Sequence, residues 1–395
     1  MTTAVMAQSM ISDSARRADF RFGRRIAIVL PNLAAIGAQR YVIGLMKRLE
    51  QSGFECSLLL QAPVGEFLDE IRAWQTFSHR VLSPVPFART LESAVRLTRM
   101  LRGHRYDQVF SVTPFLNRMI CAMKGLKLIE ARVVIEEHGY PPLYLTREDG
   151  MSRAEVGFYT RSFGLYRHAD AIRVISGGIR DFYAQHGLTA NVHFFPNLID
   201  LSRVERLANE SPAAVLPKSH RNVIVFGRLT AQKNLSFLIE GLSRPSFPRD
   251  MHLWIIGDGP QRSALEDLSA RLGVREHVTF MGYLENPYPV IRQGDALALT
   301  SVWEGSPQVL VEAMALGVPI VARDCPTGPS DILGTRSERG ALVPYSASPE
   351  EFGAALRASL NDASSEVRAG AAKSFVSGEY DLDSRMSEQI SLFFT

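Results

Sequence analysis

The chain has 395 residues, so two domains of about 200 residues each are expected, because one hydrophobic core rarely serves a longer chain. Hydrophobic residues make up 46% and charged residues 22%, which excludes a fibrous or largely disordered protein. Residues 1–200 carry 25 basic and 18 acidic side chains, and residues 201–395 carry 19 and 23, giving net charges of +7 and −4. The first half is therefore suited to anionic material such as lipid headgroups or phosphates, but the excess is too small to indicate nucleic-acid binding.

Three widely spaced cysteines, Cys56, Cys121 and Cys325, exclude a disulfide scaffold or a cysteine-rich zinc site and are typical of a reducing compartment. No uncharged apolar run approaches the roughly 18 residues needed to cross a bilayer. Residues 1–24 contain several arginines with no apolar segment after them, which indicates a disordered leader and not a signal peptide. We therefore expect a cytoplasmic protein.

Short apolar runs alternate with amphipathic stretches of helical length over residues 25–200. Strands are predicted at 26–30, 54–60, 107–113, 132–136, 171–176 and 193–195. Runs that are apolar at successive positions belong to strands covered on both faces, as in a parallel sheet built from βαβ units. The sequence therefore predicts a doubly wound α/β domain.

A polar stretch at residues 201–221 interrupts this rhythm and is interpreted as a linker. Strands are predicted again at 222–227, 253–256, 278–280, 296–299, 319–321 and 342–343, which indicates a second Rossmann-like domain over 222–375. Ligands bind at the carboxyl ends of such strands, so function is expected at strand-to-helix turns that face a cleft between the domains.

The segment 303–317 predicts a short, sharply bounded helix. Ser306 is a candidate N-cap, Pro307 suits the first helical position and Gly317 suits the stop. The first amides of this helix, at Gln308 and Val309, form an anion site suited to phosphate.

Two glutamates frame that helix. Glu304 lies just before it, at the end of a strand, and Glu312 falls inside it among apolar residues. A buried carboxylate needs a partner, and the vicinal hydroxyls of a ribose or hexose are suitable. The alternative is that Glu312 lies on a solvated helix face.

Arg228 and Lys233 follow a predicted buried strand and precede a helix, so both emerge at the carboxyl edge of the second sheet. Two cations at such a turn can stabilise a diphosphate as a leaving group, a role that a magnesium ion often fills. The alternative is a pair of solvated loop charges.

Four motifs within residues 222–345 resemble, in order, spacing and strand context, those of retaining glycosyltransferases of family 4. They are Gly227-Arg228-Leu229 with Lys233-Asn234, Gly257-Asp258-Gly259-Pro260, Gly282-Tyr283, and the block from Glu304 to Gly317. The stretch 324–333 resembles a subset that assembles bacterial surface or lipid-linked glycans from nucleotide-activated sugars. The resemblance spans nearly the whole chain and implies the GT-B fold, two facing Rossmann-like domains with an interdomain cleft and a C-terminal helix within 376–395 that returns to the first domain.

The resemblance assigns roles to matching positions. Arg228 and Lys233 match the pair that binds the donor diphosphate, Glu304 matches the carboxylate at the donor sugar and Glu312 matches the one at the ribose. Ser306-Pro307 stands where the family has Phe-Gly, which leaves the helix-start amides available but removes one donor.

Two matches in the first domain are weaker. Glu136-Glu137-His138-Gly139 resembles a His-Gly element whose histidine contacts the donor sugar, and Gly37 stands in the turn after the first strand, close to donor phosphate and acceptor. A structural histidine and a plain tight turn are the alternatives. The implied catalytic residues are Arg228, Lys233, Glu304 and His138, and the implied donor-binding residues are Glu312, Gly305, Ser306, Gln308, Val309 and Gly37.

Two further patterns, an Asp-Leu-Asp triplet and a series of arginines, have simple structural interpretations. Asp381-Leu382-Asp383 matches the DxD metal motif of other glycosyltransferases, but it opens a helical pattern, so an N-cap is expected. A basic amphipathic stretch contains Arg89, Arg96, Arg99, Arg102 and Arg105. It is either a solvated helix or a peripheral contact with an anionic membrane.

Together these observations predict a metal-independent glycosyltransferase without cofactors. It would move a sugar, with retention of configuration, from a UDP- or GDP-linked donor to a hydroxyl of a growing glycan or lipid-linked acceptor. Retention follows from the resemblance alone. The alternatives are a nucleotide-sugar epimerase or glucan phosphorylase on the same scaffold, and a non-catalytic protein that binds sugar nucleotides.

Overall fold

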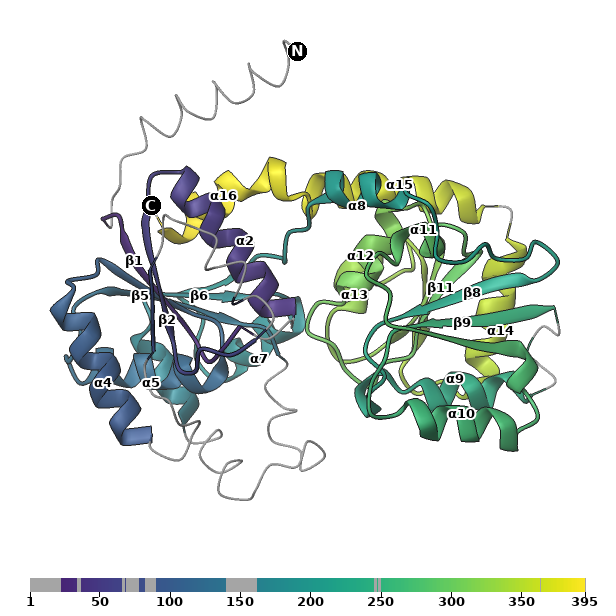
Figure 1. The fold of residues 1–395 in the computed structure, drawn as a ribbon, viewed down its shortest axis with the longest axis horizontal. Helices are drawn as coiled ribbons and strands as arrows, with labels where there is room; N and C mark the ends of the chain where they lie inside the picture. Colours follow the sequence, from purple (N-terminus) through teal and green to yellow (C-terminus); the bar gives the residue numbers. More distant parts are fainter. Residues whose placement is uncertain are drawn as a thin grey trace, which may run out of the picture. The chain divides into compact units, whose positions relative to one another are not determined.

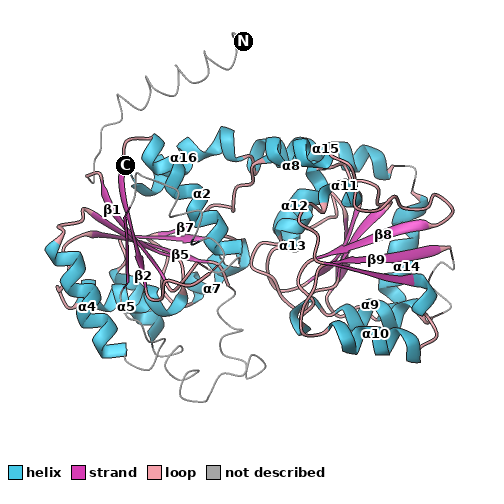
Figure 2. Ribbon diagram, in the orientation of Figure 1, coloured by secondary structure: helices cyan, strands magenta, loops and turns pink. Residues whose placement is uncertain are grey.

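The computed structural model describes residues 23–33, 37–65, 68, 78–81, 90–139, 162–244, 247, 250–362 and 364–394. The chain divides into two compact units. The first comprises Met1–Ile175, Ile179–Phe195 and Met386–Thr395, and the second Ser176–Gly178 and Pro196–Arg385. Each contains one sheet flanked by helices (Figure 1, Figure 2). Residues 1–22 of the predicted leader lie outside the described residues.

The first unit has a seven-stranded sheet in the order β3-β2-β1-β4-β5-β6-β7. Its strands are β1 (Arg25–Leu30), β2 (Glu55–Leu60), β3 (Ser78–Val81), β4 (Gln108–Ser111), β5 (Arg132–Glu137), β6 (Ala171–Val174) and β7 (Val192–Phe194). Its helices are α2 (Gly37–Gln51), α4 (Thr90–Gly103), α5 (Pro114–Gly125), the 3-10 turn Phe163–His168 and α7 (Gly177–Gln185).

Every strand pairing described in this sheet is parallel, and all six predicted strands are confirmed. The apolar run Ile26–Leu30 is fully buried, because helices cover both faces of the sheet. The strand β3 was not predicted. It has four residues, its sequence Ser-His-Arg-Val lacks an apolar run, and it lies at the edge of the sheet with β2 as its neighbour.

The second unit has a six-stranded parallel sheet in the order β10-β9-β8-β11-β12-β13. Its strands are β8 (Arg221–Phe226), β9 (Met251–Ile256), β10 (Val278–Gly282), β11 (Ala296–Leu299), β12 (Ile320–Asp324) and β13 (Ala341–Pro344). Its helices are α8 (Leu201–Ala208), α9 (Leu235–Leu242), α10 (Arg262–Arg271), α11 (Tyr288–Ile291), α12 (Gln308–Ala315), α13 (Pro329–Leu333), α14 (Pro349–Asn361) and α15 (Ser365–Glu379), with 3-10 turns at Ala231–Lys233 and Arg275–His277.

Successive residues of β8 point into two separate apolar cores of this unit. Ile224 packs with the helices α8, α11, α12, α13 and α15, whereas Val223 and Val225 pack with α9, α10 and α14. Figure 1 shows these two helix layers on opposite faces of the sheet. The predicted doubly wound α/β architecture is therefore confirmed in this unit.

The stretch 201–221 differs from the predicted linker. Its first part is the helix α8, which Asp200 caps by accepting a hydrogen bond from the Arg203 amide at 2.8 Å. Val204 and Ala208 of that helix are buried in the second unit's core. The polar composition suggested a linker because only these two residues of the helix are buried. The chain passes between the units earlier, at Phe195 and Pro196.

The last helix, α16 (Leu382–Phe394), ends in the first unit, where it lies beside α2 (Figure 1). Phe394 is 1% exposed and packs edge-on against Phe110 and Phe54, with ring centroids 5.5 and 6.4 Å apart. The Gln108 side-chain amide donates to the Phe394 carbonyl at 2.7 Å. The final turn of the chain therefore completes the core on this face of the first sheet.

Replacing Phe394 with alanine should lower the free energy of unfolding of the first unit by about 3 kcal/mol, because a large buried aromatic ring leaves a cavity. Leu392→Ala on the same helix turn is the control, since Leu392 is 43% exposed and its loss should change stability by less than about 0.5 kcal/mol. Hydrogen exchange of peptides from β1 and β4 at increasing urea measures both. Equal protection in the two variants would contradict this packing role.

Candidate active site

The second sheet reverses its strand order between β8 and β11, which are neighbours although two strands separate them in sequence. In open α/β sheets, ligands bind outside the carboxyl ends of the strands at such a point. The loop after β8 carries Arg228 and Lys233, and the loop after β11 carries Glu304. The topology thus brings three predicted site residues to the expected position.

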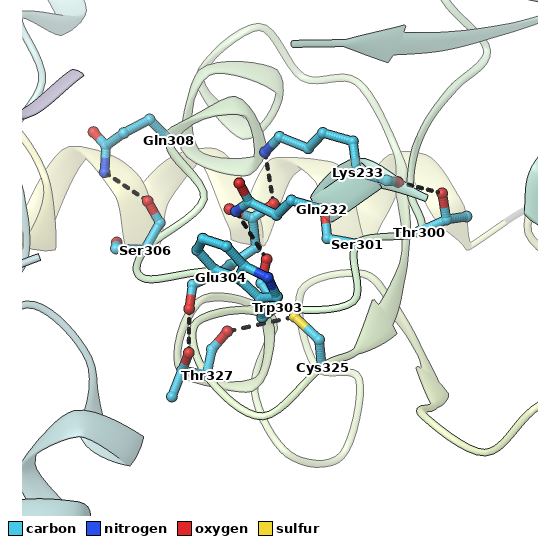
Figure 3. A network of polar contacts seen from close by, with 10 residues as sticks. All are labelled: Gln232, Lys233, Thr300, Ser301, Trp303, Glu304, Ser306, Gln308, Cys325 and Thr327. Carbon is cyan, nitrogen blue, oxygen red and sulfur yellow. Dashed lines mark hydrogen bonds and ion pairs between the residues drawn. The ribbon is translucent and has the colours of Figure 1, made fainter. Parts of the chain in front are cut away.

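An ion pair connects these two loops. Lys233 Nζ lies 2.6 Å from Glu304 Oε1, and the two side chains are 19% and 7% exposed. The Ser301 hydroxyl donates to the same carboxylate oxygen at 2.6 Å, and Figure 3 shows Lys233 and Ser301 both reaching Glu304. A cation and a carboxylate therefore lie side by side in a largely buried setting.

Gln232 holds the same two loops together through the backbone. Its side-chain amide donates to the Trp303 carbonyl at 3.0 Å (Figure 3). Its backbone carbonyl accepts from the Val302 amide at 2.8 Å. The Thr300 hydroxyl donates to the Lys233 carbonyl at 3.1 Å. These contacts fix the backbone on both sides of the ion pair.

Two glycines permit the turn that carries Arg228. Gly227 and Gly257 have φ angles of +146° and +134°, and a Cβ atom on Gly257 would lie 2.0 Å from the Gly227 carbonyl oxygen. The turns after β8 and β9 therefore touch backbone to backbone, which larger residues would prevent.

A third loop, after β12, packs beneath Glu304. The Thr327 hydroxyl donates to the Glu304 carbonyl oxygen, and a Cβ atom on Gly328, whose φ is +96°, would lie 2.5 Å from Pro307 Cδ. Burial raises the pKa of the neighbouring Cys325 thiol to about 12, and the Glu304 carboxylate adds to this shift. Cys325 is therefore a neutral packing residue and not a nucleophile.

The helix after Glu304 begins one residue later than predicted. Pro307 occupies the N-cap position with extended backbone, α12 starts at Gln308, and no hydrogen bond from the Ser306 side chain caps the helix. The Gln308 side chain instead donates to the Ser306 carbonyl at 3.5 Å (Figure 3). Within the described part of the chain, the Gln308 and Val309 amides have no acceptor, so they remain available to an anion.

Glu312 is half-buried on α12, and its Oε1 accepts a hydrogen bond from the Tyr288 hydroxyl at 2.9 Å. Its partial burial and this hydrogen bond distinguish it from a side chain on a solvated helix face.

Arg228 is exposed and forms no ion pair with any described residue. It lines a small cavity at the ends of β8 and β11 together with Gly227, Lys233 and Thr300. Two cations thus border this small cavity.

His138 and Gly37 belong to the first unit. Gly37 is the first residue of α2, and His138 follows β5 with its Nε2 2.8 Å from Glu136 Oε2. Glu136 is itself 1% exposed and accepts from Arg173 Nη1 at 2.6 Å and from the Tyr41 hydroxyl at 3.2 Å. His138 is thus one end of a buried polar cluster.

Asp381 caps α16, since its Oδ2 accepts from the Ser384 amide at 3.0 Å, which confirms the predicted N-cap. Within the described residues, no group of three or more histidine, cysteine, aspartate or glutamate side chains is placed to hold a metal ion.

Sequence reasoning missed the residues that orient the charged groups. They are Ser301, Thr327 and Tyr288 in the second unit and Glu136, Tyr41 and Arg173 in the first. One signal was available, since an arginine inside the apolar strand Ala171–Val174 requires a buried carboxylate partner. The hydroxyl donors left no such signal, because serine, threonine and tyrosine are common in turns and short helices.

Two family models match the chain, one in each half. Residues 36–203 match "Glycosyltransferase Family 4" and residues 220–362 match "Glycosyl transferases group 1".

Two relatives illustrate the similarity. The lipopolysaccharide 1,6-galactosyltransferase of Salmonella typhimurium is 33% identical over 175 residues, which covers 42% of this chain and only 46% of that enzyme. The N-acetylgalactosamine-N,N'-diacetylbacillosaminyl-diphospho-undecaprenol 4-alpha-N-acetylgalactosaminyltransferase of Campylobacter jejuni is 27% identical over 329 residues, covering 81% of this chain and 86% of that enzyme.

The crystal structure of Anabaena HepE in complex with UDP-glucose superposes with a TM-score of 0.72 at 19% identity, covering 93% of this chain and all of that one. That likeness, with the two sheets described above, shows the GT-B fold. With a family model matched in each half, the chain belongs to the group 1, family 4 glycosyltransferases.

Proposed function

We propose that the protein transfers a sugar from a UDP- or GDP-linked donor to a hydroxyl of a growing glycan or lipid-linked saccharide, with retention of configuration. The observation that carries this proposal is the contact between Lys233 and Glu304 at the ends of β8 and β11. At the junction of sugar and diphosphate, such a donor has hydroxyls, from which a carboxylate accepts hydrogen bonds, and a negative charge, which a cation stabilises. A neighbouring carboxylate and ammonium group match both halves of that junction.

Each charged group then has a separate role in the second unit. Lys233, Arg228 and the amides of Gln308 and Val309 stabilise the negative charge that develops on the departing diphosphate. Glu304 accepts hydrogen bonds from hydroxyls of the donor sugar, and Glu312 accepts from those of the ribose. Gly305 and Ser306 form the turn between these groups. In the first unit we assign His138 to the donor sugar and Gly37, the first residue of α2, to the donor phosphate.

Retention requires the new bond to form on the face that the diphosphate leaves. In this mechanism the bond between the anomeric carbon and the diphosphate oxygen breaks, and the acceptor oxygen bonds to the same carbon from the same side. The acceptor proton passes to the departing diphosphate oxygen. No side chain is then required as a covalent nucleophile, consistent with Cys325 being a neutral thiol.

The relatives described above are transferases, which favours transfer over an epimerase, a phosphorylase or a non-catalytic binding protein. Their names refer to lipopolysaccharide and diphospho-undecaprenol, so we propose an acceptor of the same chemical kind. A cytoplasmic location agrees with this acceptor and with the three buried free thiols, Cys56, Cys121 and Cys325.

Lys233→Gln should lower the turnover number by about 10²-fold or more, because it removes a charge that stabilises the leaving group. Glutamine still offers a donor to Glu304, so the melting temperature should change little. The donor is first identified from a thermal-shift panel of nucleotide sugars, since a tight ligand stabilises the native state. Lys218→Gln, at an exposed position, is the control, and turnover within threefold of wild type in Lys233→Gln would refute the assignment.

We further propose that transfer needs no metal ion, since Arg228 and Lys233 supply the positive charge at the diphosphate. Turnover of the purified protein in excess EDTA should therefore equal turnover in its absence. Loss of activity that Mg²⁺ or Mn²⁺ restores would show that a metal shares this role.

A peripheral membrane contact through α4 is the last part of the proposal. Arg96, Arg99, Arg102 and, just after the helix, Arg105 are exposed and form no ion pair with any described residue. Leu97 and Leu101 of the same helix are buried, so the arginines share the outer face. Arg89 lies outside the described residues. No helix in the described part of the chain is long and apolar enough to span a membrane.

Reversing the charges at Arg96, Arg99 and Arg102 to glutamate should abolish sedimentation of the protein with anionic vesicles at low salt. Wild type should bind and should dissociate as salt rises, since attraction is screened within about 10 Å at 0.1 M ionic strength. Reversal at Arg203, Arg206 and Lys218 in the second unit makes the same charge change and is the control. Equal binding to neutral and anionic vesicles, or to neither, would leave α4 as a solvated helix.

A further inference from the structure

Two adjacent carboxylates end β5, and both are buried. Glu136 is 1% exposed and Glu137 is fully buried. Successive side chains of a strand point to opposite faces of the sheet, so the two have separate partners. Glu137 Oε2 accepts from the Tyr166 and Tyr183 hydroxyls, each at 2.9 Å, whereas Glu136 contacts Arg173, Tyr41 and His138.

The two oxygens of Glu136 have different partners. Oε1 accepts from Arg173 Nη1 at 2.6 Å and from the Tyr41 hydroxyl at 3.2 Å, and Oε2 lies 2.8 Å from His138 Nε2. Burial by itself would raise the pKa of Glu136, but the charge of Arg173 and the hydrogen bonds from His138 and Arg173 outweigh it and hold the pKa below its usual value. Glu136 is therefore ionised at neutral pH.

An ionised carboxylate accepts hydrogen bonds and donates none. The contact between Oε2 and His138 Nε2 therefore requires the proton to reside on Nε2. In the neutral imidazole the other nitrogen, Nδ1, then carries only a lone pair. Nδ1 makes no hydrogen bond to any described residue, and the ring lies against Tyr41 with centroids 5.8 Å apart.

We propose that Glu136 is a positioning residue that holds His138 in the Nε2-protonated tautomer and so presents Nδ1 as an acceptor for a hydroxyl of the bound sugar. The sugar contact rests on the proposed function, whereas the tautomer rests on the contacts of Glu136 alone. Gln389 of α16 extends the cluster by donating to the Tyr41 hydroxyl. The last helix therefore contacts Tyr41, which in turn donates to Glu136.

The tautomer is measured directly by NMR of protein labelled with ¹⁵N at histidine, at about pH 8, where an ordinary imidazole is neutral. The signals of His138 are those that disappear in His138→Asn. In wild type we expect a protonated Nε2 and a bare Nδ1. A protonated Nδ1 in wild type would overturn the proposal without reference to any variant or to activity.

Glu136→Gln should reverse the tautomer. Arg173 and Tyr41 require an acceptor at the Oε1 position, so the carboxamide oxygen occupies it and the NH₂ group faces His138. Nε2 must then accept, which moves the proton to Nδ1. Glu137→Gln makes the same chemical change one residue away on the opposite face of the sheet and should leave the His138 signals unchanged. An unchanged tautomer in Glu136→Gln would contradict the proposal.

Kinetics test whether the tautomer matters for transfer. Glu136→Gln should lower kcat about tenfold or more with a change in donor KM below about threefold, and Glu137→Gln should stay close to wild type. In a His138→Asn background, Glu136→Gln should lower kcat by less than about twofold further, because a residue that acts through His138 has no effect without it. Additive losses would indicate a purely structural role for Glu136.

The sugar contact and the tautomer of His138 are tested separately. If His138→Asn retains wild-type kcat, the proposed sugar contact is wrong, while the NMR measurement still decides whether Glu136 sets the tautomer. If Glu136→Gln does not fold, the wild-type spectrum alone decides that question.

Discussion

Glu304 is 5% exposed at the carboxyl edge of the second sheet, and its Oε1 lies 2.6 Å from Lys233 Nζ. Removing a carboxylate from water is costly unless a cation or several donors replace the lost hydration. The surrounding loops satisfy this requirement, since Gln232 and Thr300 fix the backbone around the lysine and Ser301 adds a hydroxyl donor. A buried ion pair is weak evidence for stability, because well-packed apolar residues often serve as well. The pair is better explained by the ligand that the site is proposed to bind.

The first unit meets the same requirement with different chemistry. Glu136 pairs with Arg173 on the neighbouring strand and accepts a hydrogen bond from His138, and the Arg173 charge together with these hydrogen bonds holds its pKa low. Burial raises the pKa of Glu137. The positive charge of Arg118 and the hydrogen bonds from two tyrosine hydroxyls offset this rise only in part. The pKa values of two consecutive glutamates are therefore shifted in opposite directions, because a strand directs them to opposite faces of one sheet. The glutamate that contacts His138 is the one whose pKa is lowered, which favours the ionised form that can orient the imidazole.

The last helix has a structural role and a proposed functional one. Phe394 fills the core beside Phe110 and Phe54, and Gln389, five residues earlier, donates to Tyr41. The same element that completes the hydrophobic core of the first unit thus reaches the polar cluster around Glu136. A substitution of Phe394 can therefore lower stability, whereas a substitution of Gln389 can change the orientation of His138.

The sequence by itself determined the fold class, twelve of the thirteen described strands and the charged residues at the carboxyl edge of the second sheet. Apolar runs of strand length and turns of fixed residue type are local features, and parallel strands must end at the same edge. The tertiary structure decided which strands become neighbours, and so which loops meet. It showed that 201–208 is a packed helix, that α12 begins at Gln308, and that Ser301, Tyr288 and Glu136 orient the charged groups. These contacts join residues from different loops and strands, and no local pattern specifies them, because each hydrogen bond depends on distances that only the packed sheet creates.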